Sequence, residues 1–362
     1  MTTPTPQPPA AAAEKVRYRI SGGSGYIQLN RPKALNSLDQ DMITSIDAAV
    51  DLWREEPSVH QIVITSGHEK AFCAGGDVRA VREAILAGTP ELGEEFFTTE
   101  YRLNHKIAQI STHKPYVAII DGIAMGGGLG VSMHGSHRIV TERASAAMPE
   151  MAIGFIPDVG ITHFSQQVVS ALGRPLPELA RFIGLSGYRL NAADMLWAGW
   201  ATHFVPSAAL AEFSESMDAE GVEAALQRHA IDPTGAQDGE LGLPEAQLPG
   251  WYDDIAASFS GKGWADYSPA PQFSDLLASA NPESLVAAAE LYRINDAPGV
   301  TLEQALANEL RLGAYMRAQP NFLEGVRAVL VDKDRNAQFH PATTEEVSLA
   351  PIRQSLIGMD SR

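Results

Sequence analysis

Apolar and polar residues follow the periods of strands and helices along the first part of the chain. Residues 16–30 alternate into the segment GYIQLN, which predicts a β-strand ending at the turn NRPKALNSL. Apolar residues then recur three and four positions apart, which predicts a helix over residues 39–53. The residues expected on its buried face are Met42, Ile43, Ile46, Ala49, Val50 and Trp53.

Two longer segments repeat one order of elements. The β-branched run QIVITSG predicts a strand, and it leads into HEKAFCAGGDVRAVREAI, a glycine turn followed by a helix. The segment PYVAIIDGIAMGGGLGVSMHGSHRIV has the same order and ends in a further strand. Strands that alternate with helices predict an α/β core.

The pattern becomes mostly helical from Ser165 onward. The segment GYRLNAADMLWAGWATHFV predicts a helix that leads to a short strand. A stretch rich in Gly, Pro and Asp near residues 231–268 predicts a loop or linker. Helices are expected again over residues 274–280, 282–294 and 301–318.

Local signals mark some of these boundaries. Asn281 stands before a proline, and Thr301 is followed three residues later by Gln304, which is the spacing of a capping box. The Pro, Thr and Ala composition of residues 1–14 predicts disorder. This segment lacks the basic start and long apolar run of a signal peptide.

Composition and charge narrow the class of protein. The 362 residues are 45% hydrophobic and 20% charged, which is typical of a soluble globular protein. The net charge of −17 argues against binding nucleic acid or an anionic membrane through bulk electrostatics. Cys73 is the one cysteine, so neither an intrachain disulfide nor a cysteine zinc motif is expected. We therefore expect a reducing compartment, the cytoplasm, and no membrane span.

Two glycine turns are the first candidates for chemistry. CAGGD (residues 73–77) and MGGGLG (residues 125–130) each follow an apolar strand and open a helix. Glycine lets a ligand approach the backbone, and the N–H groups of a helix start could hold a carbonyl oxygen that becomes an oxyanion. Taken alone, each turn is better explained by tight packing of helix on strand. GGGLGV lacks the G-x-G-x-x-G spacing of dinucleotide sites.

The second candidates are two carboxylates in the apolar run AAMPEMAIGFIPDVG. Glu150 and Asp158 each follow a proline, which is also common at ordinary helix starts. A desolvated carboxyl group, by contrast, can titrate near neutral pH and act as a general base or acid. The histidines near these segments show no metal-ligand spacing.

Together these segments resemble the crotonase, or enoyl-CoA hydratase/isomerase, superfamily. The resemblance rests on LNRPKALNSL, KAFCAGGDVRA and GIAMGGGLGVSMHGSHRIVTERASAAMPEMAIGFIPDVG, and it resumes downstream in NFLEGVRAVLVDKDRNAQFHPA. It implies an α/β fold, a spiral of ββα units, as a core domain over residues 15–210. A mainly helical region over residues 211–362 would follow, and the family commonly assembles as trimers or dimers of trimers.

Within the superfamily, the chain most resembles the 3-hydroxyisobutyryl-CoA hydrolases. Gly130 stands where similar hydratases have a glutamate, and Asp158 stands where hydratases usually have glycine. The segments FFTTEYRLN and EGVRAVLVDKD also resemble those of the hydrolases. The chain departs from them at Ile161 and Thr162, where the hydrolases usually have small residues. Larger side chains there could reshape the acyl pocket, so the sequence leaves the identity of the acyl group open.

The resemblance also implies site residues. Gly76 and Gly127 match the two backbone N–H donors of the family's oxyanion hole. Glu150 and Asp158 match the catalytic acids of the hydrolases, and Glu100 matches an acid that contacts the acyl group. The other expected substrate-binding residues are Lys33, Ala34, Leu35, Ala71, Cys73, Ala74, Gly75, Asp77 and Gly126.

Three functions are compatible with these residues. The first is hydrolysis of a short 3-hydroxyacyl-CoA thioester, 3-hydroxyisobutyryl-CoA to 3-hydroxyisobutyrate and CoA, as in valine catabolism. The second is an enoyl-CoA hydratase or isomerase, and the third is a non-catalytic acyl-CoA-binding protein. The expected partner in each case is an acyl-CoA, with coenzyme A as part of the substrate and no metal or other cofactor. Neither nucleic acid nor a membrane is an expected partner.

Overall fold

The computed structural model describes residues 15–232 and 241–357. The expected disordered segment, residues 1–14, lies outside these residues. The chain divides into two compact units, each assembled from segments that are separate in the sequence. The described parts of the first unit are residues 15–76, 102–146, 190–232 and 241–247, and those of the second are residues 77–101, 147–189 and 248–357.

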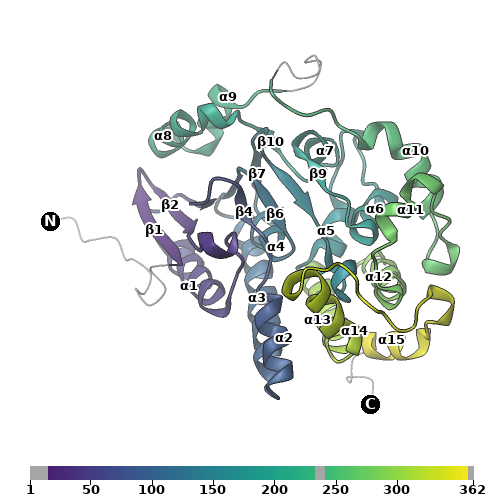
Figure 1. Ribbon diagram of the computed structural model, residues 1–362. Coiled ribbons are helices and arrows are strands. Elements are labelled where there is room, and N and C mark those ends of the chain that lie inside the picture. Colours follow the sequence, from purple (N-terminus) through teal and green to yellow (C-terminus); the bar gives the residue numbers. More distant parts are fainter. Residues whose placement is uncertain (1–14, 233–240, 358–362) are drawn as a thin grey trace. The chain divides into compact units, whose positions relative to one another are not determined.

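The first unit contains the β-structure. One sheet has six strands in the order β1-β2-β3-β5-β7-β10, and the other has four in the order β4-β6-β8-β9 (Figure 1). Strands β1 and β2 pair antiparallel, as do β8 and β9, whereas β2–β3, β3–β5, β5–β7, β7–β10 and β4–β6 pair in parallel. The strands are β1 (Val16–Ser21), β2 (Ser24–Leu29), β3 (Gln61–Ser66), β4 (Ala71–Cys73), β5 (Tyr116–Ile120), β6 (Ile123–Met125), β7 (His137–Val140), β8 (Ser145–Ala147), β9 (Leu190–Asn191) and β10 (His203–Phe204).

The single strand expected over residues 16–30 is a hairpin. Strands β1 and β2 pair antiparallel, and the chain reverses at Gly22 and Gly23, which both have positive φ values, 51° and 87°. Glycine adopts this backbone region without the steric cost of a Cβ atom, so the turn interrupts a continuous alternating pattern.

The helices of the first unit cover its larger sheet. The six apolar residues predicted for α1 (Gln40–Glu55) are all buried. Residues of β3, β5 and β7 share one apolar cluster with residues of α8 (Leu210–Glu220) and α9 (Val222–His229). The domain boundary expected near residue 210 therefore falls inside this unit, because α8 and α9 supply part of the core under the sheet. The remaining helices here are α4 (Gly127–Met133) and α7 (Ala192–Trp197).

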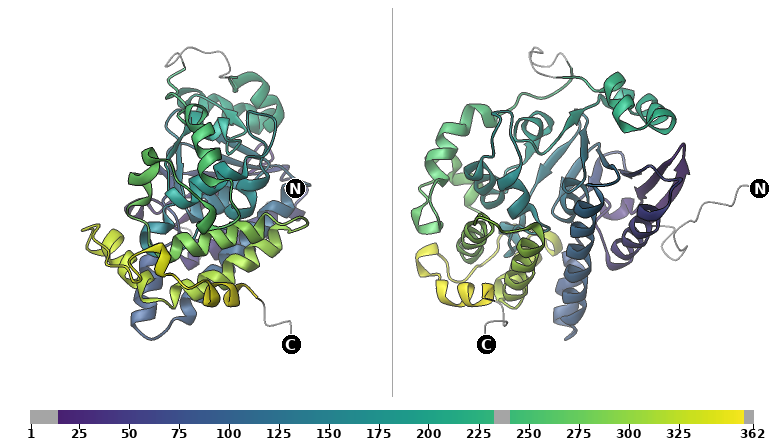
Figure 2. Two further views of the ribbon diagram at one scale, coloured as in Figure 1. Left: turned by 90° about the vertical axis from the view of Figure 1, so that its right-hand side faces the viewer. Right: turned by 180° about the vertical axis from the view of Figure 1, so that it is seen from behind.

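The second unit is mainly helical. In both views of Figure 2 the lime to yellow helices α12, α13 and α14 lie together, and α15 packs on α12 and α13. None of the helices in residues 15–232 and 241–357 is both long and apolar enough to span a bilayer. The helices are α2 (Val78–Leu86), α3 (Glu91–Ile110, shared with the first unit from Arg102), α5 (Ile161–Gln167), α6 (Pro177–Ser186), α10 (Leu248–Phe259), α11 (Ser274–Leu277), α12 (Pro282–Asn295), α13 (Leu302–Arg317), α14 (Pro320–Val326) and α15 (Leu349–Leu356).

Two sequence expectations for this unit are confirmed and one is corrected. Asn281 caps α12 by accepting a hydrogen bond from the N–H of Glu283, and Thr301 and Gln304 form a reciprocal capping box at α13. The stretch near residues 231–268 is not irregular throughout. It contains α10, whose apolar residues Ile255 and Phe259 are fully buried.

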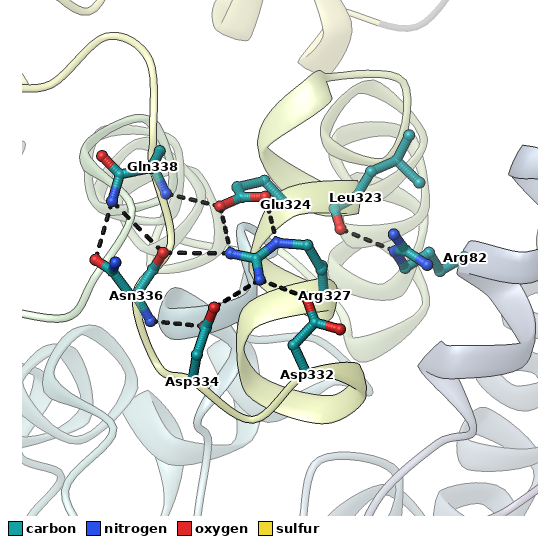
Figure 3. Close-up of polar contacts among 8 residues, drawn as sticks. All are labelled: Arg82, Leu323, Glu324, Arg327, Asp332, Asp334, Asn336 and Gln338. Carbon is teal, nitrogen blue, oxygen red and sulfur yellow. Dashed lines mark hydrogen bonds and ion pairs between the residues drawn. The ribbon is translucent and has the colours of Figure 1, made fainter.

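The tail segment EGVRAVLVDKD is organised around one guanidinium group. Arg327 donates to both carboxylate oxygens of Glu324 at 2.8 Å, to Asp332 at 2.6 Å and to Asp334 at 2.8 Å (Figure 3). Exposed ion pairs taken singly contribute little, but four charge-assisted bonds on one planar group fix a loop geometry. The network holds the loop that follows α14 and a short π-helix, Arg327–Val331.

Close packing of α14 gives a test of the second unit. A Cβ atom on Gly325 would lie 2.4 Å from the carbonyl carbon of Ile153, which ends the short 3-10 helix η3 (Glu150–Ile153). We expect Gly325→Ala to lower the free energy of unfolding by about 1–3 kcal/mol, because backbone must move to admit the methyl group. Gly250→Ala in α10 is the matched control, since no heavy atom lies within 4 Å of its Cβ position. Chemical denaturation of both variants checks this, and equal stabilities would contradict it.

Candidate active site

The structure brings the two glycine turns of the first unit together. Strands β4 and β6 pair in parallel, and a turn follows each strand at the same end. A Cβ atom on Gly128 would lie 2.6 Å from the carbonyl oxygen of Cys73, so glycine is required for this approach. Gly127 is the first residue of α4, and its N–H therefore has no acceptor within the helix. Gly76, in the other turn, forms a bridge with Leu38.

The expected substrate-binding loop lies against the first of these turns. The N–H of Ala74 donates to the carbonyl oxygen of Leu35 at 3.0 Å, and the Cys73 thiol lies 3.0 Å from the carbonyl oxygen of Asn36. Lys33 and Ala34 belong to the short helix η2 (Pro32–Ala34). The remaining residues expected here are Ala71 in β4, Gly75, and Gly126 as the N-cap of α4. Asp77 caps α2 by accepting a hydrogen bond from the N–H of Ala80.

The second unit brings the three expected acids together. Glu150 begins η3, Asp158 lies in the turn before α5, and Glu100 lies on α3. Their exposed fractions are 7%, 5% and 1%, so all three carboxyl groups are removed from water. One oxygen of Glu150 and one of Glu100 have no hydrogen-bond partner within the described chain. Unpaired buried carboxyl oxygens are costly to a fold, which favours a functional explanation for this cluster.

One tyrosine hydroxyl and one guanidinium group act on Asp158. The Tyr101 hydroxyl donates to an oxygen of Asp158 at 2.6 Å. The guanidinium of Arg317, from the end of α13, lies 4.4 Å above the ring centre of Phe97, and Phe97 packs against Phe155 at 5.2 Å between ring centres. Phe97 and Phe155 are 2% and 1% exposed, so this aromatic cluster is buried.

This environment shifts the acids toward neutral pH. Burial raises the pKa of Asp158 to about 7, although the Tyr101 hydrogen bond and the charge of Arg317 both act to lower it. Burial, and then the charge of Asp158, raise the pKa of Glu150 and of Glu100 well above the usual value. Carboxyl groups whose pKa is raised by burial are candidates for general acid or base catalysis.

A fourth acid supports the turn that carries Asp158. The carboxylate of Glu309, on α13, accepts the N–H of Gly160 at 2.7 Å and the hydroxyl of Thr162. Burial raises the pKa of Glu309 to about 8, and the charge of Asp158 adds to that effect. Ile161 and Thr162, the two bulky residues noted in the sequence, are fully buried in the first turn of α5.

Tyr101, Arg317 and Glu309 were not identified from the sequence. Tyr101 directly follows Glu100, but nothing local shows that its hydroxyl meets a residue 57 positions away. Glu309 and Arg317 lie eight positions apart on the buried side of α13, among apolar residues. Charged residues at apolar positions of a helical pattern are the signal that could have found them.

Metal-ligating groups give no further candidate. Within residues 15–232 and 241–357, the His, Cys, Asp and Glu side chains form no group of three or more that could hold a metal ion.

Comparison with known sequences gives a family match over nearly the whole chain. The sequence profile of the enoyl-CoA hydratase/isomerase family matches residues 24–356. The mitochondrial 3-hydroxyisobutyryl-CoA hydrolase of Xenopus laevis is 37% identical over 357 residues, covering 94% of this chain and 88% of the relative. The human protein of the same name is 36% identical over 352 residues, covering 93% and 87%.

Two solved structures match both units. A carnitinyl-CoA dehydratase from Mycobacterium thermoresistibile has a TM-score of 0.84 at 34% identity, and an enoyl-CoA hydratase from Rhodobacter sphaeroides 2.4.1 has a TM-score of 0.82 at 32% identity. Each alignment covers 96% of this chain and 98% of the other. The expected crotonase-like fold is confirmed.

The Tyr101 hydrogen bond can be tested without a substrate. Because the hydroxyl stabilises the ionised carboxylate, we expect Tyr101→Phe to raise the pKa of Asp158 above about 7. A carbon-13 NMR titration of the aspartate carboxyl groups, assigned with Asp158→Asn, measures this. Tyr252→Phe is the matched control, because that hydroxyl accepts a hydrogen bond from the exposed side chain of Arg174 at 3.0 Å. A pKa that stays unchanged or falls would contradict the role given to Tyr101.

Proposed function

The chain belongs to the enoyl-CoA hydratase/isomerase family, and we propose that it hydrolyses 3-hydroxyisobutyryl-CoA to 3-hydroxyisobutyrate and CoA. The observation that carries the proposal is the buried pair Glu150 and Asp158, with Glu100 beside them. These acids occur in a chain whose curated relatives, at 34 to 37% identity along most of its length, are named as hydrolases of this thioester.

In the proposed reaction, the N–H groups of Gly76 and Gly127 receive the thioester carbonyl oxygen. They stabilise the oxyanion of the tetrahedral intermediate, and each such donor contributes about 3–4 kcal/mol in known oxyanion holes. The parallel pairing of β4 and β6 supports this role, because it puts both turns at one end of the sheet.

Glu150 provides the attacking group, either its own carboxylate, which gives a mixed anhydride, or a water molecule that it deprotonates. Both routes add the elements of water across the carbon–sulfur bond and release CoA as a thiol. A thiol pKa near ~8.5 makes the thiolate a tolerable leaving group, so strong acid assistance is not required. Asp158 orients the acyl hydroxyl or the water and exchanges a proton, and Glu100 contacts the acyl group.

A second candidate function is hydration of an enoyl-CoA. It is favoured by the two similar solved structures, which are named as a carnitinyl-CoA dehydratase and an enoyl-CoA hydratase. Gly130 argues against it, because similar hydratases have a glutamate at this position of α4, and glycine has no carboxylate to act as a second acid or base. A crotonyl-CoA assay separates the two: loss of the enoyl chromophore without free thiol indicates a hydratase.

Other features of the proposal rest on the family resemblance and composition. We propose a homo-oligomer, a trimer or dimer of trimers, with no metal or separate cofactor. The lone buried Cys73 supports a reducing compartment, such as the cytoplasm. A place in valine catabolism follows if 3-hydroxyisobutyryl-CoA is preferred in a thiol-release assay across a panel of short 3-hydroxyacyl-CoAs.

Replacing the attacking group gives the most direct test. We expect Glu150→Gln to reduce thiol release from 3-hydroxyisobutyryl-CoA by at least about 10³-fold, since removing a catalytic nucleophile or base has costs of this order. Binding of the acyl-CoA, measured by calorimetry, should survive because the amide has the same shape. Glu212→Gln, at an exposed residue in the first turn of α8, is the control and should keep full activity. A fully active Glu150→Gln enzyme would remove the basis of the mechanism.

The raised pKa values predict the pH dependence. Glu150 must be ionised to act, and its pKa is held well above the usual value by burial and by Asp158. We therefore expect the acid limb of kcat/KM to lie at a higher pH than the usual glutamate pKa. In Asp158→Asn the nearby charge is gone, so the acid limb of the residual activity should move to lower pH. A limb near the usual glutamate pKa in the unmodified enzyme would contradict this assignment.

A further inference from the structure

We infer that Glu309 and Thr162 are positioning residues that hold the Asp158 turn in its reactive conformation. The group consisting of the Glu309 carboxylate, the Gly160 N–H and the Thr162 hydroxyl is called the clamp below. The inference rests on the proposed function, in which Asp158 acts on the acyl group or water.

The turn that carries Asp158 has a backbone that needs external support. Val159 has a φ of 53°, which is an unfavourable value for a β-branched residue, and Gly160 follows with a φ of 80°. Gly160 is also the N-cap of α5 and offers no side chain to accept the first N–H groups of the helix. The Glu309 carboxylate, 149 residues away, accepts the N–H of Gly160, and it also accepts the side-chain hydroxyl of Thr162 in the first turn of α5.

A chain of side-chain amides sets the direction of the clamp's hydrogen bonds. The amide of Asn295 donates to the Thr162 hydroxyl oxygen at 2.7 Å, and the amide of Asn308 donates to Asn295 at 2.8 Å. Because the Thr162 oxygen accepts from Asn295, its own hydrogen is directed to Glu309. Arg311 donates to the Asn308 oxygen at 2.5 Å and ends the chain. The clamp is thus tied to α12 and α13 together.

The clamp and the site acids belong to one electrostatic group. Glu309 bonds to Gly160, two residues after Asp158, and the charge of Asp158 is among the causes that raise the pKa of Glu309. A helix cap with no part in function would be expected at the surface, whereas Glu309, Thr162 and Ile161 are fully buried. A displacement of the clamp is therefore expected to displace Asp158 relative to the acyl hydroxyl or the water on which it acts in the proposed reaction.

The test compares hydroxyl variants in α5. Thr162→Val keeps the shape and removes the donor, Thr162→Ser restores the donor, and Ser165→Ala removes a different buried hydroxyl, which bonds to the Ile161 carbonyl in the same helix. Steady-state kinetics with 3-hydroxyisobutyryl-CoA are normalised to the folded fraction. We expect Thr162→Val to lower kcat by about 10- to 100-fold with KM changed less than about twofold, since small displacements of catalytic groups have costs of this order. Thr162→Ser and Ser165→Ala should remain within about threefold of the unmodified enzyme.

Glu309→Gln provides a second variant in case Thr162→Val folds poorly. The amide can accept one hydrogen bond but not both, so kcat should again fall while KM holds. Unchanged kcat per folded molecule in both Thr162→Val and Glu309→Gln would overturn the inference, as would an equal kcat loss in Ser165→Ala.

Amide hydrogen exchange gives a readout that needs no substrate. The Gly160 N–H should exchange faster in Glu309→Gln than in Ser165→Ala, and unchanged protection would overturn the clamp itself. If the unmodified enzyme releases no thiol from any 3-hydroxyacyl-CoA, the proposed function fails. Protection of Gly160 that depends on Glu309 would in that case still support the clamp as the support of the Asp158 turn.

Discussion

Keeping carboxyl groups away from water is the constraint on which the second unit depends. Glu150, Asp158 and Glu309 are buried, and burial is the largest cause of the raised pKa in each case. A raised pKa means that the folded chain binds the proton more tightly than the unfolded chain. The contribution to stability is therefore present below the unfolded pKa near 4 and is lost as the pH rises through about 7 for Asp158 and about 8 for Glu309. The folded protein is therefore less stabilised by proton binding in the pH range where the acids are ionised.

Local polar and steric devices hold these acids in place. The Tyr101 hydroxyl and the Arg317 guanidinium both favour the ionised form of Asp158, against the larger effect of burial. Helix α14 packs directly against the short helix that begins at Glu150. Gly325 permits this, because a Cβ atom there would collide with the backbone of Ile153. The first unit uses the same device where Gly128 meets the Cys73 carbonyl. In both units, the elements that carry catalytic candidates pack through glycines, at positions where a Cβ atom would collide with the neighbouring backbone.

The sequence predicted what local pattern determines and missed what distant pairing determines. The apolar face of α1 and the caps of α12 and α13 follow from residues a few positions apart, and all are confirmed. The alternating pattern predicts one strand where the structure has a hairpin, because the alternation continues through the turn that Gly22 and Gly23 make possible. The division into units could not be found locally, since α8 and α9 join the sheet only through tertiary packing. The family motifs led to Glu100, Glu150 and Asp158, whereas Glu309 and Tyr101 depend on contacts across 149 and 57 residues that no motif records.

The titration of these acids favours hydrolysis over hydration on physical grounds. Hydrolysis converts a thioester that is neutral at its carbonyl group into a carboxylate. Burial raises the pKa of Asp158 to about 7 and that of Glu150 well above its usual value, so both groups ionise at a higher pH than free carboxyl groups do. An ionised Asp158 or Glu150 repels a new carboxylate at close range, so the charge state that permits attack also favours release of the product. Hydration of an enoyl-CoA creates no new charge at the reacting carbons, and a group of buried acids would then have no such effect on its product. The absence of a side chain at Gly130 and the presence of Asp158 therefore point to the same reaction.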